Sequence, residues 1–418
     1  MATLFVLPWL LMAAVGARYV SASPAAQAGP QTFTVLTGAG FTLTTGEKPS
    51  WQGQNFYPAT VTVNVGDSIV WKHNSGNEPH TVTFLGPVTD PGPPVIPDPA
   101  ATMPVGSPPK LIINPMHANP AGGPTYDGSA FTNSGQIAAD IPVPQEFKLT
   151  FTKAGTYDYL CLLHSGILPN GMAVGMVGKV VVQDAGSAYP MTPEQVMAEG
   201  QRLIAADMQK AMDLNPVMEE TYKPAEQMAD GTTMHHVAVG NMDMSRNLEF
   251  ERFAPTEIRV KAGDTVEWSL GMAPAFHTVT FGDEPDLFTI EPQPQGPPNI
   301  VLNNDVLFPV GPNVHTGTGY YNSGILAGPN DPPEMGLKSY SLKFTQPGRY
   351  EYICVPHYSL GMIGTVVVEA ATTTGGTPVG MPQTGAGDAG WLFLGLLALA
   401  LVLSGAAVRV VAQKRKSA

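Results

Sequence analysis

The sequence predicts an all-β protein made of two tandem β-sandwich domains joined by a helical linker, with a transmembrane helix near the C-terminus. The 418 residues include 45 glycines and 41 prolines but only 13% charged residues, a composition that favours short strands and many turns over long helices. One pattern of strands, turns and polar residues occurs twice. An uncharged apolar run long enough to cross a bilayer lies close to the C-terminus.

The net charge limits the possible partners. The chain has 21 Lys and Arg against 34 Asp and Glu, a formal charge of −13. Proteins that bind DNA or RNA neutralise phosphates with basic side chains, so nucleic acid is not an expected partner. The 43% hydrophobic content is sufficient for packed cores, so the glycine and proline content does not indicate general disorder.

Residues 1–28 have the features of a signal peptide. Residues 4–15 form an apolar stretch, and Ala26-Gln27-Ala28 is suited to cleavage because its flanking residues are small. No Lys or Arg precedes the apolar stretch, which leaves an uncleaved anchor as the alternative. Either interpretation predicts that the protein is exported.

The C-terminal segment predicts a stalk, a membrane anchor and a basic tail. Residues 391–408 are uncharged and just long enough to span a bilayer, and the basic residues of 409–418 should stay in the cytoplasm. The stalk, residues 370–390, is rich in Pro, Gly and Thr, and residues 381–385 (MPQTG) resemble a sortase signal with Met replacing the usual Leu. The folded part should therefore be extracytoplasmic, held by the membrane helix or, alternatively, linked to the cell wall.

The internal repeat defines two domains, residues 31–183 and 232–369. Residues 61–71 and 258–268 each show alternating hydrophobicity, a Gly-Asp turn and alternation again, which predicts a hairpin. Further segments match in the same order: 79–84 with 276–281, 133–135 with 322–324, and 154–161 with 347–354. Many short strands between Gly and Pro turns are typical of a β-sandwich or barrel.

Residues 184–231, between the repeats, predict a helical linker. Thr192 is a suitable N-cap, Pro193 suits the first turn, and Gln195 stands three residues after the cap. The helix should reach about Leu214. Five apolar residues keep roughly to one face and should pack on a domain: Val196, Leu203, Ile204, Met208 and Met212.

Each repeat contains one cysteine at the end of a strand, followed by a histidine and then a methionine. In the second repeat these are Cys354, His357 and Met362, with His277 far upstream. Two imidazoles, a thiolate and a thioether suit copper that cycles between Cu(I) and Cu(II), because the sulfurs favour Cu(I) and the imidazoles also serve Cu(II).

The first repeat offers His80, Cys161 and His164, with Met176 or Met172 as the fourth donor. Met176 is favoured because a Gly-Met pair leads into the last strand here, as it does in the second repeat. Met176 lies 12 residues after His164, whereas Met362 lies 5 residues after His357. The longer loop would alter the axial bond, so the two sites need not be equivalent.

These residues resemble the cupredoxin family of blue copper proteins, which includes plastocyanin, azurin, auracyanin and halocyanin. The resemblance rests on the Cys-x2-His-x4-Met pattern at residues 354–362, on His277, and on the Gly-Met-Ile-Gly run into the final strand. It implies a Greek-key β-sandwich in each repeat, with one type 1 copper in each, and it implies that His164 and His357 are the ligands nearest the surface. The chain would then be an electron carrier and not an enzyme, with cytochromes or membrane oxidoreductases as redox partners.

Other interpretations remain open. A two-domain copper enzyme of the nitrite reductase kind needs more histidine ligands, but no His-x-His occurs and neither cysteine has an adjacent histidine. The His235-His236 pair is explained more simply by the two opposite faces of a strand. The metal could also be cargo of a copper-sequestering or delivery protein, or be absent from one repeat, more readily the first. A disulfide between the two cysteines would leave the repeated His and Met unexplained.

Overall fold

The computed structural model describes residues 29–42, 50–76, 78–102, 108–139, 143–168, 170–220, 223–271, 275–328 and 336–370. The predicted signal peptide, most of the stalk, the transmembrane helix and the basic tail lie outside these residues. Within them, no helix is both long enough and apolar enough to cross a membrane.

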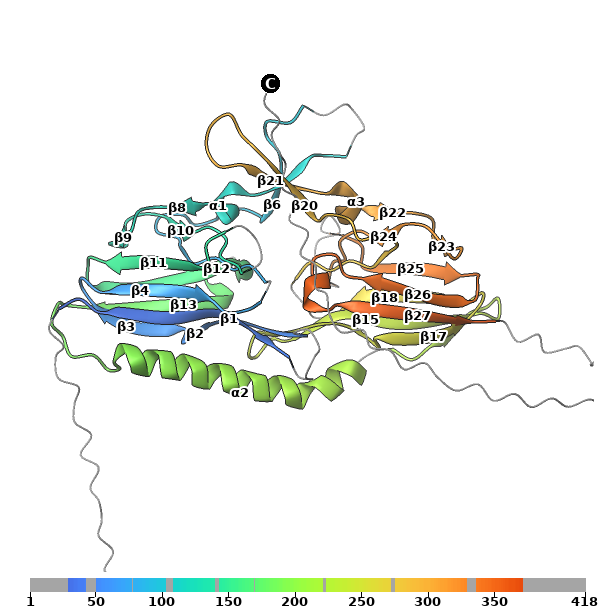
Figure 1. The fold of residues 1–418 in the computed structure, drawn as a ribbon, viewed down its shortest axis with the longest axis horizontal. Helices are drawn as coiled ribbons and strands as arrows, with labels where there is room; N and C mark the ends of the chain where they lie inside the picture. Colours follow the sequence, from blue (N-terminus) through green and yellow to red (C-terminus); the bar gives the residue numbers. More distant parts are fainter. Residues whose placement is uncertain are drawn as a thin grey trace, which may run out of the picture. The chain divides into compact units, whose positions relative to one another are not determined.

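The first repeat folds as two packed sheets (Figure 1). The first sheet has the order β2 (Trp51–Tyr57), β1 (Thr32–Phe41), β4 (Ser68–His73), β11 (Glu146–Phe151) and β9 (Thr125–Tyr126). The second has the order β3 (Thr60–Asn64), β13 (Ala173–Gln183), β12 (Gly155–Ile167), β5 (Thr83–Phe84), β10 (Thr132–Ser134) and β8 (Pro120–Ala121). Aromatic side chains, among them Trp71, Phe84 and Tyr159, fill the core between the sheets.

The second repeat has the same plan. Its first sheet has the order β16 (Leu248–Ala254), β15 (Thr233–Asp243), β18 (Thr265–Leu270), β25 (Ser339–Phe344) and β23 (Val314–His315), with β14 (Glu226–Gln227) beside β15. Its second has the order β17 (Glu257–Lys261), β27 (Ile363–Glu369), β26 (Gly348–Ile353), β19 (Thr280–Phe281), β24 (Tyr321–Ser323) and β22 (Pro309–Val310). Trp268, Phe281 and Tyr352 occupy the equivalent core positions. The prediction of β-sandwich repeats is confirmed.

The two repeats share one sheet, which the sequence pattern did not predict. Strands β2 and β16 pair antiparallel, with Gln52 opposite Glu249, and this joins both first sheets into one sheet of 11 strands. The backbone N–H of Gln54 donates to the Asn247 carbonyl, and that of Glu251 donates to the Ser50 carbonyl, both at 2.8 Å. Because β2 and β16 are equivalent strands, each repeat offers the same edge to the other, as in a symmetric dimer.

A second joint is built from insertions in both repeats. Strands β6 (Val95–Pro97) and β7 (Leu111–Ile113) of the first repeat form a four-stranded sheet with β20 (Phe288–Glu291) and β21 (Asn299–Leu302) of the second. The pairing again joins equivalent elements, since β7 pairs with β21 and short helices follow both: α1 (Pro115–Ala118) and α3 (Asn304–Leu307). Two separate joints therefore hold the repeats together.

Helix α2 (Pro193–Glu220) begins where the sequence indicated, and it extends beyond Leu214. The Gln195 N–H donates to Thr192 Oγ1 and the Thr192 N–H donates to Gln195 Oε1, a capping box. The helix packs on β1, β2 and β16, and Trp51 Nε1 donates to Asn215 Oδ1 at 2.9 Å.

The expected apolar face of α2 was partly wrong. Met208 and Met212 are each 37% exposed, whereas Ala211 and Asp207 are buried. Asp207 can occupy a buried position because it accepts hydrogen bonds from the Tyr57 hydroxyl and the Arg246 guanidinium. A hydrophobicity pattern does not show such a satisfied polar contact.

Candidate metal centres

In the first repeat, the imidazoles of two histidines converge on the sulfur of a cysteine. Cys161 lies in β12, His80 lies just before β5, and His164 follows the cysteine in the same strand. The Nδ1 atoms of His80 and His164 are 3.1 Å apart, and they lie 3.9 and 3.4 Å from Cys161 Sγ. Three donor atoms at these separations can share one metal ion.

The second repeat contains the same arrangement. The Nδ1 atoms of His277 and His357 are 3.1 Å apart, and each lies 3.5 Å from Cys354 Sγ. A single 3-10 turn, η2 (Tyr358–Leu360), follows His357 and leads to the final strand. Both cysteines are free and lie in different cores, so the disulfide interpretation is wrong.

The buried methionines distinguish the candidates for a fourth donor. Met176 and Met362 are fully buried, each in the same cluster as its repeat's cysteine, whereas Met172 is 53% exposed. The pairing of Leu160 with Val177 places the residues next to them, Cys161 and Met176, where the β12–β13 register becomes irregular. Of the two candidates in the first repeat, Met176 therefore has the surroundings that its counterpart Met362 has.

A glycine precedes each of these methionines for a steric reason. Gly175 has φ +90°, and a Cβ atom there would lie 2.5 Å from the carbonyl oxygen of His164. Gly361 in the second repeat has φ +89°. Such left-handed backbone favours glycine, which explains the Gly-Met pair that the two repeats share.

Each cysteine sulfur accepts one backbone hydrogen bond from the threonine that follows the upstream histidine. The Thr81 N–H lies 3.3 Å from Cys161 Sγ, and the Thr278 N–H lies 3.4 Å from Cys354 Sγ. The same threonines accept a backbone N–H from the residue after each cysteine. This exchange holds the histidine and cysteine segments in register and favours a thiolate.

The two centres differ in their electrostatics. Burial alone would lower the pKa of His164, but the Cys161 sulfur and the Glu78 carboxylate raise it well above its usual value. Burial opposes ionisation of Cys161, yet His164 lowers the pKa of that thiol overall. In the second repeat, burial raises the pKa of Cys354 to about 12 and lowers the pKa of His357. The metal-free first centre thus favours a thiolate–imidazolium pair and the second a neutral thiol.

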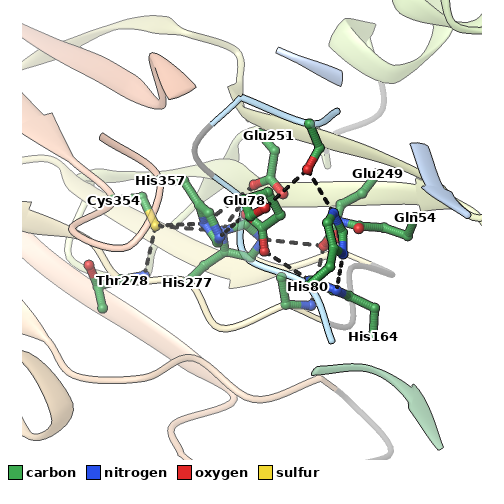
Figure 2. A network of polar contacts seen from close by, with 12 residues as sticks. Gln54, Glu78, His80, His164, Glu249, Glu251, His277, Thr278, Cys354 and His357 are labelled. Atoms are coloured by element: carbon green, nitrogen blue, oxygen red, sulfur yellow. Dashed lines mark hydrogen bonds and ion pairs between the residues drawn. The ribbon is translucent and has the colours of Figure 1, made fainter. Parts of the chain in front are cut away.

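A buried group of carboxylates lies beside these histidines, and sequence reasoning missed it (Figure 2). Glu78 Oε1 lies 2.9 Å from His164 Nε2, while Glu78 Oε2 lies 3.8 Å from His357 Nε2. From β16, Glu251 Oε2 lies 3.3 Å from His357 Nδ1 and Glu249 Oε1 lies 3.9 Å from His277 Nε2. The position of Glu78, two residues before a ligand histidine, was the one available signal.

His164 and His357 are the more exposed imidazole of each pair, as the resemblance implied, but neither lies at an open surface. Their side chains are 5% and 6% exposed, and His80 and His277 are fully buried. The cause is the joint between the repeats, which places Glu78 between the two rings. All four imidazoles are therefore shielded from solvent.

The remaining histidines do not form a further histidine-rich site among the described residues. His235 contacts Asp264, whereas its neighbour His236 contacts Glu267, as expected for opposite faces of β15. Across the described part of the chain, three groups of His, Cys, Asp and Glu could hold a metal: the two centres above, and Glu78, Glu251 and His357. The third group shares His357 with the second centre.

Comparison with known proteins identifies relatives of both repeats. The sequence profile of the copper binding proteins of the plastocyanin/azurin family matches residues 49–183 and 238–369, more than half of the chain. A plastocyanin of Scenedesmus fuscus is 30% identical over 117 residues, which cover 28% of this chain and 86% of the relative. The chloroplastic plastocyanin of Tetradesmus obliquus is 29% identical over 128 residues, 31% of this chain, and the match spans only 58% of that relative.

Solved structures with similar folds include plastocyanin and pseudoazurin. The oxidised plastocyanin of Dryopteris crassirhizoma is 25% identical and matches 32% of this chain and 99% of its own, with a TM-score of 0.17. The pseudoazurin of Hyphomicrobium denitrificans is 20% identical and matches 32% of this chain and 74% of its own, with a TM-score of 0.18.

Proposed function

Because the chain belongs to the plastocyanin/azurin family of copper-binding electron-transfer proteins, we propose that it is an exported electron carrier with one type 1 copper in each repeat. The observation that carries the proposal is the convergence of two histidine Nδ1 atoms and one cysteine Sγ, with the same residue order, in both repeats.

The donor set fits copper. His80, Cys161, His164 and Met176 would hold the metal in the first repeat, and His277, Cys354, His357 and Met362 would hold it in the second. Copper bound by two imidazoles, a thiolate and a weak thioether supplies one-electron exchange between Cu(II) and Cu(I).

The protein's own contribution is to fix the donors before the metal arrives. Each cysteine is locked by its threonine N–H bond, and each buried methionine is held by the core around it. Side chains that are already in place and shielded from water need little rearrangement when an electron arrives or leaves, which favours fast transfer. The sulfurs would bind as thiolates, so metal uptake should release the Cys354 proton.

The proposed location rests on the segments outside the fold, and the proposed partners rest on the family and on the net charge. The predicted signal peptide and the predicted C-terminal membrane helix support an extracytoplasmic protein held at the membrane, with attachment to the cell wall as the alternative. Redox proteins such as cytochromes or membrane oxidoreductases would exchange electrons with it, and the charge of −13 favours a partner with a basic docking patch.

A copper enzyme is the second candidate, because Glu78, Glu251 and His357 form a third buried group that could hold a metal. The carrier and the enzyme differ in copper content and in the type of copper signal. A third copper with an ordinary type 2 signal would favour the enzyme.

The test is to load the purified full-length protein with copper and to measure copper per chain, the visible spectrum and the electron paramagnetic resonance (EPR) spectrum. The proposal expects two coppers, intense blue absorption and the narrow hyperfine coupling of thiolate-bound Cu(II). Copper that is colourless and readily lost would instead indicate a sequestering or delivery protein.

A further inference from the structure

We propose that the two copper centres form an intramolecular electron relay, in which Glu78 links a ligand histidine of one repeat to a ligand histidine of the other. The relay rests on the proposed function, because it requires copper in both repeats. It adds to that function a fixed internal partner for each centre.

The first step of the argument is the geometry of the carboxylate. In both centres the Nδ1 atoms face the cysteine sulfur, so the Nε2 atoms point away from the metal position. When Nδ1 holds a metal, Nε2 carries the proton and donates it in a hydrogen bond. His164 Nε2 donates to Glu78 Oε1 at 2.9 Å, and Glu78 Oε2 lies 3.8 Å from His357 Nε2. One side chain thus contacts a ligand from each repeat.

The second step is burial. The side chains of His164, Glu78 and His357 are only 5%, 10% and 6% exposed. Because the ligands and the carboxylate between them are shielded from water, little solvent has to reorganise when charge moves from one centre to the other. Figure 2 shows Glu78 between the histidines of the two repeats.

The third step is rigidity. The β2–β16 pairing lies beside this path, and Gln54 Nε2 donates to Glu249 Oε2 at 3.2 Å across it. The β7–β21 pairing is a second joint, and Lys110 reinforces it by pairing with Glu291 of the other repeat. Two joints hold the two donor sets at one separation, as a relay requires.

The exchange is balanced without another reactant. One electron passes from the reduced centre to the oxidised centre, so one centre is oxidised as the other is reduced. No covalent bond forms or breaks, and Glu78 keeps its hydrogen bond to His164 throughout.

The first measurement is the separation of the centres in the fully oxidised, copper-loaded full chain, by pulsed dipolar EPR. A single short and narrow distance is expected, and Cys161→Ser or Cys354→Ser should abolish the dipolar signal. A broad distribution of distances would overturn the relay, because the repeats would then not hold the centres in one position.

The second measurement is the rate of exchange. The Met362→Gln variant should give the second centre a distinct spectrum, so that the two coppers can be followed separately. A pulse of radicals then reduces only part of the copper in this variant. The later transfer of electrons between the two centres, followed by their two absorption bands, should be first order and independent of protein concentration. Glu78→Leu should slow it by an order of magnitude, while Glu78→Gln, which keeps a hydrogen-bonding side chain of the same length, should retain most of the rate.

Glu267→Leu is the matched control, because it changes another glutamate that contacts a histidine, the non-ligand His236, and leaves the His164–Glu78–His357 contacts in place. Its rate should remain close to that of the parent. The relay would be overturned, and the proposed function kept, if the chain holds two blue coppers but Glu78→Leu does not change the transfer rate. A transfer rate that rises with protein concentration would have the same meaning. A chain without blue copper would overturn the proposed function itself.

Discussion

The two centres share their donors but differ in the charges around them. Gln54 and Glu251 each stand two residues before an equivalent core phenylalanine, Phe56 or Phe253, so a neutral amide in the first repeat replaces a carboxylate in the second. Glu78 is two residues before His80, and Ala275 holds the same place before His277. Equivalent scaffolds therefore carry different outer residues, which allows each centre to be tuned separately.

The difference should give the two coppers unequal reduction potentials. Glu251 Oε2 lies 3.3 and 3.8 Å from the Nδ1 atoms of His357 and His277, and neither Glu251 oxygen has a hydrogen-bond partner among the described residues. Burial raises the pKa of Glu251 in the metal-free chain, but a nearby metal cation favours the carboxylate. A carboxylate at this position stabilises Cu(II) more than Cu(I), so the second centre should have the lower potential.

The largest effect on this comparison should come from removing one centre at a time. Cys161→Ser and Cys354→Ser should each leave one copper per chain and remove one blue band, because serine offers no thiolate. Copper analysis with visible and EPR spectroscopy measures both. A variant that lost both coppers would show that the centres are not independent sites.

The donors were predictable because they are local and repeated. The spacing of Cys354, His357 and Met362 is a short motif, and the first repeat shows it again with a longer loop. The start of α2 was predictable for the same reason, since its capping box lies within residues 192–195.

The carboxylate group was not predictable, because it depends on contacts between distant parts of the chain. In β16, Glu249 and Glu251 alternate with Leu248 and Phe250, a pattern that normally places the acids in solvent. Their burial arises because β16 pairs with β2, almost 200 residues earlier, and Gln54 to Glu249 is one such contact, with a separation of 195. The repeat reveals two equivalent units but does not show that they share an edge.

The second largest effect tests the axial donor of the first centre. Met176→Leu should raise the potential of this centre by about 100 mV, or about 2.3 kcal/mol per electron, since Cu(II) loses a donor and gains an apolar neighbour. Met172→Leu is the matched control, and its exposed side chain should leave the potential unchanged. A redox titration of the blue band distinguishes the two, and the opposite outcome would assign Met172 as the donor.

A smaller shift should follow from making the two centres more alike. Glu251→Gln gives the second repeat the residue of the first, and should raise the potential of the second centre by roughly 60 mV, a tenfold change in a one-electron equilibrium. The reverse change, Gln54→Glu, should lower the potential of the first centre. Equal potentials in the parent protein would contradict the role assigned to Glu251.

The smallest effect concerns the metal-free chain and separates the thiols by pH. His164 lowers the pKa of Cys161 against the effect of burial, whereas burial raises the pKa of Cys354 to about 12. As the pH rises, the ultraviolet absorbance of one thiolate per chain should therefore appear below the usual thiol range, and that of the second should be absent until strongly alkaline pH. Cys161→Ser should remove the early step and Cys354→Ser should keep it. If the thiolate absorbance at low pH survives in Cys161→Ser, it does not come from Cys161, and the proposed effect of His164 on the pKa of that thiol would be contradicted.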